Sequence, residues 1–221
     1  MNEVSIIWAD SHLVVVNKPA GLPTLPDGYV KDAPNLVEIL NHSYDRVWIV
    51  HRLDRDTSGV IVFARSAEIH RALNAQFDTR RVSKIYHAIV RGTPEWEAIV
   101  VDQPLRPDGD RRHRTIVDAV RGKPAVTHLH VIERFDQQAL IEAVPETGRT
   151  HQIRVHLAFQ GYPIVADALY GDGQGVAGLT RLGLHARSLA FEHPITHKAM
   201  RFDAPYPEDF ASALKNLAGF S

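Results

Sequence analysis

The chain has 221 residues, of which 44% are hydrophobic and 23% are charged, and its formal net charge is −1 at pH 7. This composition is typical of an ordinary globular protein and excludes fibrous, disordered and membrane-spanning classes. The absence of cysteine excludes disulfides, thiol nucleophiles and cysteine-ligated metals. No segment reaches the roughly 20 apolar residues that cross a bilayer, and no basic segment precedes an apolar run at the N-terminus. We therefore expect a cytoplasmic protein that does not associate with membranes.

The charge is unevenly spread along the chain. A near-zero net charge argues against a general polyanion binder, because cations that neutralise phosphates supply most of the affinity for nucleic acid. Cations nevertheless concentrate at Thr79–Lys84 and at Arg106–Thr115. On charge alone, such runs are usually solvated faces. The second run lies in a long Gly- and Pro-rich segment from Asp102 to Pro124, which is a candidate for a substrate-facing loop.

The first elements predicted are two short strands, at 5–8 and 13–17, which are separated by a polar turn. A helix is expected to follow Asn35, because Asn35 can serve as its N-cap and Glu38 completes a pattern like a capping box.

Further along, Ile69, Leu73 and Phe77 recur with helical spacing and predict an amphipathic helix. Residues 82–92 alternate as a strand does. Two more strands are predicted to flank the turn DQQ at residues 136–138.

A short helix is predicted at residues 151–160, with Thr150 as its N-cap and Gly161 as the residue that ends it. Strands outnumber helices, and regular βαβ alternation is missing. We therefore predict an α+β fold with a mixed, mainly antiparallel central sheet and flanking helices, rather than a doubly wound sheet. We expect residues 1–221 to form a single domain.

The stretch HRLDRDTSG, residues 51–59, is unusually polar for its position between apolar segments that predict strands. It carries His51, Arg52, Asp54 and Asp56 among its ionisable residues. An ionised and oriented carboxylate here could attack carbon or accept a proton. A structural salt bridge is the commoner role of such an aspartate.

Arg154 lies in the opening turn of the predicted helix, where the positive end of the helix dipole disfavours a cation. A nearby anion would remove this conflict, and Asp54 and Asp56 are the candidates. His151 lies one turn earlier and could project toward the same partner. A bidentate arginine would keep the carboxylate ionised.

Two other kinds of site can be built from these residues. His51, Asp54 and Asp56, with His151 or His156, could form a metal site, although 13 histidines make chance clusters easy. Asp54 and Asp56 could also be the paired carboxylates of a glycosidase. The surrounding cations fit a phosphodiester backbone better than a neutral sugar.

A resemblance to a known family extends through nearly the whole chain. HRLDRDTSG resembles the signature HRLDxxTSG of the RluA family of pseudouridine synthases. Five further segments are similar to the family in the same order, namely VVVNKPAGL at 14–22, KIYHAIVRG at 84–92, GKPAVTHLHVIERF at 122–135, TGRTHQIRVHLAFQGYPIVADALYG at 147–171 and LHARSLAFEHP at 184–194. The resemblance implies a pseudouridine synthase fold with a central RNA-binding cleft, and an enzyme that isomerises uridine to pseudouridine in RNA.

The resemblance also implies roles for individual residues. It implies no metal and no organic cofactor. Asp54 matches the catalytic nucleophile, and Arg154 matches its arginine partner. Tyr86 matches the tyrosine that packs on the uracil and could take the C5 proton. Arg52 matches the arginine placed where the target base leaves the stack, a step that costs a few kcal/mol. The candidate RNA contacts are Arg52, His51, Thr57, Lys84, Arg149 and His151.

One position departs from the family, which usually has Gly-Asp where this chain has Ala166 and Asp167. The departure places the local turn in question, although not the chemistry. The motifs begin close to residue 1, so we expect no N-terminal S4 domain. The expected substrate is then a stem-loop of ribosomal or transfer RNA, bound by a monomer that needs no protein partner. The competing hypotheses are a non-catalytic RNA chaperone and a carbohydrate or metal-dependent hydrolase.

Overall fold

The computed structural model describes residues 4–26 and 33–219. In this part of the chain there are twelve strands and four helices, so the predicted α+β class is confirmed. The chain divides into two compact units, one made of Met1–Lys84 and Ala186–Tyr206 and the other of Ile85–His185 and Pro207–Ser221. The prediction of a single catalytic domain stays a prediction. No helix in the described residues has the length and apolar character needed to cross a membrane.

The first unit is built on antiparallel strands. β1 pairs with β2, β2 with β4, and β12 with β11, while the short β3 also pairs with β4. The register places Leu13 opposite Ala64 and Lys18 opposite Gly59. The strands are β1 Ser5–Ala9, β2 Leu13–Lys18, β3 Trp48–Ile49, β4 Ser58–Ala64, β11 Leu184–Glu192, whose first two residues belong to the second unit, and β12 Ala199–Asp203.

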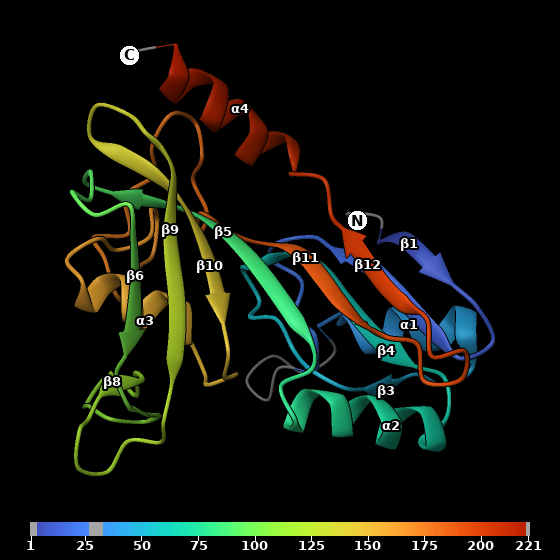
Figure 1. Ribbon diagram of the computed structural model, residues 1–221. Helices are drawn as coiled ribbons and strands as arrows, with labels where there is room; N and C mark the ends of the chain where they lie inside the picture. Colours follow the sequence, from blue (N-terminus) through green and yellow to red (C-terminus); the bar gives the residue numbers. More distant parts are fainter. Residues whose placement is uncertain (1–3, 27–32, 220–221) are drawn as a thin grey trace. The chain divides into compact units, whose positions relative to one another are not determined.

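Two helices with well-formed N-termini complete the first unit, α1 (Leu36–Tyr44) and α2 (Ala67–Asp78). The side chain of Asn35 accepts a hydrogen bond from the backbone N–H of Glu38 at 3.1 Å, which confirms Asn35 as the N-cap of α1. Helix α2 lies against β3 and β4 (Figure 1) and buries Ile69 and Leu73, as its spacing predicts.

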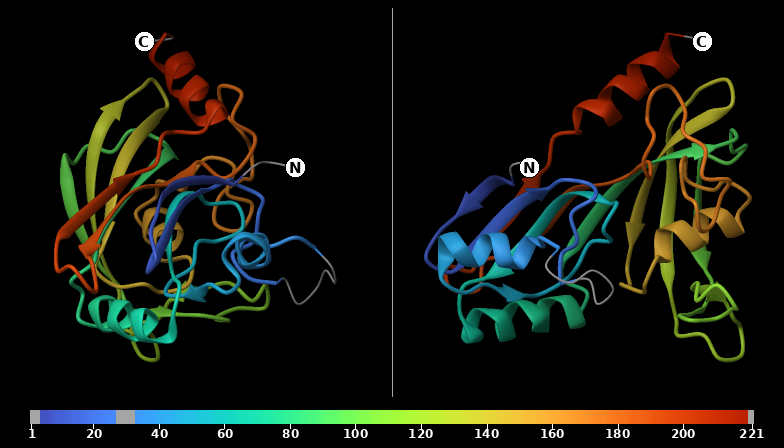
Figure 2. Two further views of the ribbon diagram at one scale, coloured as in Figure 1. Left: turned by 90° about the vertical axis from the view of Figure 1, so that its right-hand side faces the viewer. Right: turned by 180° about the vertical axis from the view of Figure 1, so that it is seen from behind.

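The second unit is a four-stranded antiparallel sheet in the order β5, β10, β9 and β6. Helix α3 packs against β9 and β10, with its axis across the strands (Figures 1 and 2). The elements of this unit are β5 Ser83–Arg91, whose first two residues belong to the first unit, β6 Ala98–Asp102, β7 Leu105–Arg106, β8 Ile116–Val117, β9 Val126–Arg134, β10 Gln138–Pro145, α3 Gln152–Phe159 and α4 Glu208–Ala218.

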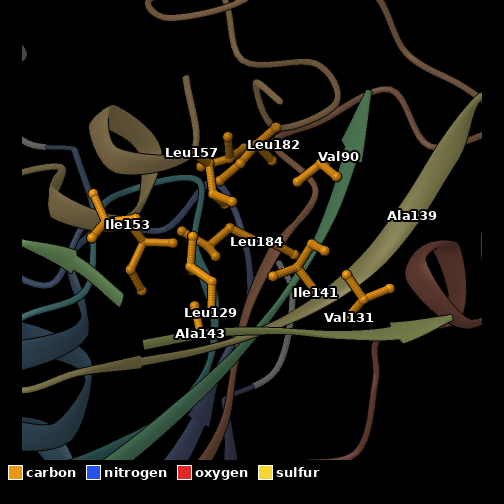
Figure 3. Packing of buried hydrophobic residues seen from close by; sticks show 13 residues of the cluster. Val90, Leu129, Val131, Ala139, Ile141, Ala143, Ile153, Leu157, Leu182 and Leu184 are labelled. Atoms are coloured by element: carbon orange, nitrogen blue, oxygen red, sulfur yellow. The ribbon is translucent and has the colours of Figure 1, made fainter. Parts of the chain in front are cut away.

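The core of the second unit joins its sheet to α3 (Figure 3). Alternate residues of β5, β9 and β10 meet Ile153 and Leu157 of α3, so one face of the sheet is buried against the helix. The sheet side of this cluster consists of Ala88, Val90, Val101, Leu129, Val131, Ala139, Ile141 and Ala143. Burial of this apolar stripe fixes where the first turn of α3 lies.

The segment from Asp102 to Pro124, predicted to be a substrate-facing loop, contains a short two-stranded hairpin of β7 and β8. One local prediction is wrong. Helix α3 begins at Gln152, and its N-cap is His151 rather than Thr150. Within the polar stretch 51–59 the chain turns at Arg55 and Asp56, and Ser58 and Gly59 already belong to β4.

Candidate functional site

The polar stretch identified in the sequence forms a tight turn between β3 and β4. The carbonyl of Asp54 accepts a hydrogen bond from the N–H of Thr57 at 3.2 Å, which closes a four-residue turn. Asp54 is half-buried, whereas Arg52, Arg55 and Asp56 are exposed. The turn therefore presents one partly enclosed carboxylate among solvated charges.

A buried lysine holds this turn in place. Lys18, at the end of β2, is fully buried, and its ammonium donates to the carbonyls of Pro19, Leu22 and Arg55 at 2.9, 2.7 and 2.9 Å. A buried cation is tolerated only when its protons are used in hydrogen bonds. These bonds join the segment after β2 to the residue that follows Asp54.

Backbone and side-chain hydrogen bonds reinforce the same junction. The N–H of Gly21 donates to the carbonyl of Arg55 at 2.9 Å. The hydroxyl of Thr24 donates to the carbonyl of Leu53 at 2.8 Å and accepts a hydrogen bond from the N–H of Leu53 at 3.3 Å. The residues on either side of Asp54 are thus bound to the segment 18–24. The position of Asp54 is therefore set by a stretch that lies 30 to 36 residues earlier.

His51 has a structural role in this unit. Its Nε2 accepts a hydrogen bond from the N–H of Val62 at 3.2 Å, and its ring stacks on Phe77 at 4.8 Å between centroids. Burial, with a smaller effect from the charge of Lys84, lowers the pKa of His51 to about 3. The neutral ring therefore carries its proton on Nδ1 at ordinary pH. This bond gives His51 a structural role, and its predicted contact with RNA stays a prediction.

The first unit contains two further predicted RNA contacts. Burial lowers the pKa of Lys84 to about 8, so this lysine titrates near physiological pH. Thr57 is 1% exposed, and its hydroxyl has no hydrogen-bond partner among the described residues. A side chain buried to this extent reaches RNA only if the turn moves.

Arg154 of α3 forms a buried ion pair that the sequence reasoning missed. Its Nε and Nη2 donate to the two carboxylate oxygens of Asp167 at 2.7 and 2.8 Å. The side chains are 10% and 0% exposed. Burial alone would raise the pKa of Asp167, but the hydrogen bonds and charge of Arg154 outweigh this effect and lower it. Asp167 therefore remains ionised and supplies the anion that Arg154 requires near the helix N-terminus.

The backbone around Asp167 is arranged to support this pair. Its Oδ1 also accepts from the N–H groups of Leu169 and Tyr170, at 2.9 and 3.1 Å. Ala166, where the family usually has glycine, has a φ of +57°. The sequence signal for this feature is the alanine at position 166, where the family usually has glycine.

His151 and Arg154 both contact Tyr170, and the carboxylate partner that the sequence predicts for both stays a prediction. His151 adopts the left-handed conformation with φ of +55°, and its Nδ1 lies 2.9 Å from the hydroxyl of Tyr170. The same hydroxyl accepts from the N–H of Thr115 at 3.0 Å, and the Tyr170 ring lies 5.1 Å from the guanidinium carbon of Arg154. Tyr170 thus connects the start of α3 to the β7–β8 hairpin.

Tyr86 lies on β5 opposite Ala143 and packs, partly buried, against the cluster that contains Ile153. Because Ile153 directly precedes Arg154, one core positions both candidate catalytic residues of this unit. Arg149 is exposed, and its Nε donates to the carbonyl of Pro124 at 3.1 Å.

The predicted site residues thus fall into two groups. The first unit contains His51, Arg52, Asp54, Thr57 and Lys84, and the second contains Tyr86, Arg149, His151 and Arg154. The pairing of Asp54 with Arg154 stays a prediction. Among the described residues, no three His, Asp or Glu side chains are arranged to hold a metal ion.

Comparison with known proteins links both groups to one family. The sequence profile described as RNA pseudouridylate synthase matches residues 12–159. This range includes the Asp54 turn, Tyr86 and Arg154. It therefore draws on both compact units.

Individual relatives match over nearly the whole chain. Ribosomal large subunit pseudouridine synthase D of Pseudomonas aeruginosa is 41% identical, and the alignment covers 97% of this chain and 72% of that protein. Ribosomal large subunit pseudouridine synthase C of Vibrio vulnificus is 39% identical, with coverages of 96% and 69%. The solved structure of Human RNA Pseudouridylate Synthase Domain Containing 4 superimposes with a TM-score of 0.78 at 30% identity, with coverages of 97% and 93%.

Proposed function

Because the chain belongs to the RNA pseudouridylate synthase family, we propose that it isomerises specific uridines of ribosomal RNA to pseudouridine. In this reaction the N1–C1′ bond of uridine breaks and a C5–C1′ bond forms, while the hydrogen on C5 leaves and N1 gains one. The ribosomal substrate is supported by the names of the relatives from Pseudomonas aeruginosa and Vibrio vulnificus. A transfer RNA stem-loop is the second substrate to test.

The proposed nucleophile is Asp54. An ionised carboxylate that attacks the sugar or the base assists departure of uracil from C1′, and it must be held in place to do so. The hydrogen bonds from Lys18 and Thr24 on either side of Asp54 support this role, because they restrain the peptide that carries the carboxylate.

Arg154 and Tyr86 are the proposed partners of Asp54. An arginine oriented by Asp167 can keep a second carboxylate ionised through its permanent positive charge. The ring of Tyr86, supported from behind by the core of the second unit, can pack on the uracil and take the proton from C5.

The remaining predicted residues are proposed to bind RNA. Arg52 is exposed beside Asp54 and would stabilise RNA from which the target base has been flipped. Lys84, Arg149, His151, His51 and Thr57 are the other proposed contacts. Of these, Lys84 and Arg149 offer charge to phosphates, whereas His51 and Thr57 act through the shape of the turn.

We propose that residues 1–221 work as one catalytic domain, because the family match spans residues of both units. We further propose that the enzyme acts in the cytoplasm as a monomer, without a cofactor or an obligatory protein partner.

The single observation that supports the proposal most strongly is the family match across residues 12–159. Chemical mapping of pseudouridines in ribosomal and transfer RNA, from cells with and without the protein, tests it. We expect one or more ribosomal positions to lose pseudouridine and to regain it with the wild-type protein but not with Asp54→Asn. An unchanged map would refute the proposal, and restoration by Asp54→Asn would favour a non-catalytic RNA chaperone.

A further inference from the structure

The segment between β6 and β9 is more precisely built than a surface loop requires. We call residues 105–123, which contain β7 and β8, the basic hairpin. Leu105 exchanges both backbone hydrogen bonds with Lys123 at 2.9 Å and pairs with Val117 on its other side. A Cβ on Gly109 would lie 2.3 Å from the side chain of Ile116. Such close packing indicates a fixed conformation.

The cations of the basic hairpin fall into two classes. Arg106 pairs with Asp118 at 2.6 Å and Arg114 pairs with Asp110 at 2.7 Å, so these arginines hold the hairpin together. Hydrogen bonds from the N–H of Arg121 and from Arg106 lower the pKa of Asp118 to about 2, and this carboxylate therefore stays ionised.

The second class of cations is exposed to solvent. Arg111 and Arg112 form no ion pair with a carboxylate among the described residues. The guanidinium of Arg112 makes a 3.5 Å contact with the carbonyl of Ala168. Lys123 is also exposed, and Arg121 is 72% exposed and 3.7 Å from Asp118. The three carboxylates of the hairpin are thus already paired, Asp108 with His113, Asp110 with Arg114 and Asp118 with Arg106.

The basic hairpin is anchored to the candidate catalytic elements of its own unit. Arg114 donates to the carbonyl of Leu169 at 2.8 Å, and the N–H of Thr115 donates to the hydroxyl of Tyr170. The side chains of Leu105 and Val117 pack with Val155 of α3. The backbone that carries the exposed cations is consequently held at a fixed place relative to Arg154. Pro124, which follows Lys123, accepts a hydrogen bond from Arg149.

We propose that the basic hairpin is an RNA-binding arm in which Arg111 and Arg112 neutralise backbone phosphates near the target uridine. This inference rests on the proposed function, and it adds the element that grips the RNA outside the reacting nucleotide. Because the backbone that carries these arginines is held in place, binding orders only their side chains, and they contribute to both affinity and register. They act on phosphates and carry no base-specific information.

The test is the double variant Arg111→Gln/Arg112→Gln, with Arg71→Gln/Lys215→Gln as a control that removes the same charge from exposed helix positions. Binding of an unmodified large-subunit ribosomal RNA transcript is measured by filter retention at several salt concentrations. Turnover is measured by tritium release from the same transcript labelled at uridine C5. Each lost phosphate contact lowers the slope of log K against log salt by about 0.7–0.9.

We expect the hairpin variant to bind at least about fivefold more weakly, with a salt slope smaller by about 1–2, a raised KM and a kcat within twofold of wild type. The control should behave as wild type. Unchanged affinity and slope in the hairpin variant, or an equal loss in the control, would overturn the proposal. Wild-type protein that binds but releases no tritium would contradict the proposed function instead, and the affinity comparison would still decide the role of the hairpin.

Discussion

Arg154 and Asp167 form a bidentate, buried ion pair in which Nε and Nη2 of the arginine meet the two carboxylate oxygens at 2.7 and 2.8 Å. The pair fixes the plane of the guanidinium before any substrate arrives. It leaves the Nη1 side facing away from Asp167. The orientation of Arg154, the proposed catalytic arginine, is thus set by a residue 13 positions further along the chain.

Asp167→Asn should therefore impair catalysis more than RNA binding. The amide keeps the shape but removes the charge, and a misplacement of about 1 Å can cost about 100-fold in rate. We expect kcat to fall by about that factor with Kd for RNA within threefold of wild type, measured by tritium release and filter binding. Asp167→Glu, which retains the charge, should fold and lose less activity. An Asn variant with wild-type kcat would show that Asp167 does not position Arg154.

Lys18→Met should destabilise the first unit and loosen the Asp54 turn. The carbonyls of Pro19 and Leu22 would lose the ammonium, whereas the carbonyl of Arg55 would keep the N–H of Gly21. Each orphaned buried acceptor costs about 1–3 kcal/mol. Urea unfolding should show a loss of about 2 kcal/mol or more. Lys198→Met, at an exposed position, is the control and should leave stability unchanged. Equal stability of the two variants would contradict this role of Lys18.

The shifted pKa of Lys84 predicts a pH-dependent affinity for RNA. Burial lowers this pKa to about 8, so the cation present at pH 7 is largely lost at pH 9. A charged hydrogen bond contributes about 1.5 kcal/mol, and RNA affinity should therefore fall about tenfold over this range. Lys84→Arg stays protonated throughout and should abolish the decline. Kd values at pH 7, 8 and 9 that remain constant for wild type would exclude a phosphate contact by Lys84.

Ala166→Gly should leave the protein as stable or make it more stable. Left-handed backbone costs an alanine about 1–2 kcal/mol, while the extra freedom of glycine in the unfolded chain offsets about 0.4–1 kcal/mol of this. A net gain near 1 kcal/mol would raise Tm by about 2–4 °C. The matched variant Ala168→Gly, at an exposed position outside the left-handed region, should not raise Tm. A lower Tm for Ala166→Gly would argue against strain at this turn.

The sequence predicts those features that depend on local spacing. Asn35 was recognisable as an N-cap from its distance to Glu38, and Ile69 and Leu73 revealed the buried face of α2. The position of the Asp54 turn followed from the apolar segments around it. These patterns reflect hydrogen bonds and burial within a few residues.

Features set by distant contacts could not be predicted in the same way. The start of α3 was misplaced because His151 adopts a left-handed conformation that its side chain does not announce. Asp167 was missed because its partner lies across a loop, and the clamp by Lys18 joins residues 37 positions apart. The hairpin of β7 and β8 depends on packing against α3, which charge and composition do not reveal.

The most direct test of the central claim compares Asp54→Asn with Asp56→Asn, two carboxylates on the same turn, of which the second is exposed. Tritium release from ribosomal RNA labelled at uridine C5 is measured for both variants and for wild type, with RNA affinity measured in parallel. We predict no detectable release by Asp54→Asn, near wild-type release by Asp56→Asn, and similar affinity in all three proteins. Turnover by Asp54→Asn comparable to wild type would contradict the assignment of Asp54 as the nucleophile.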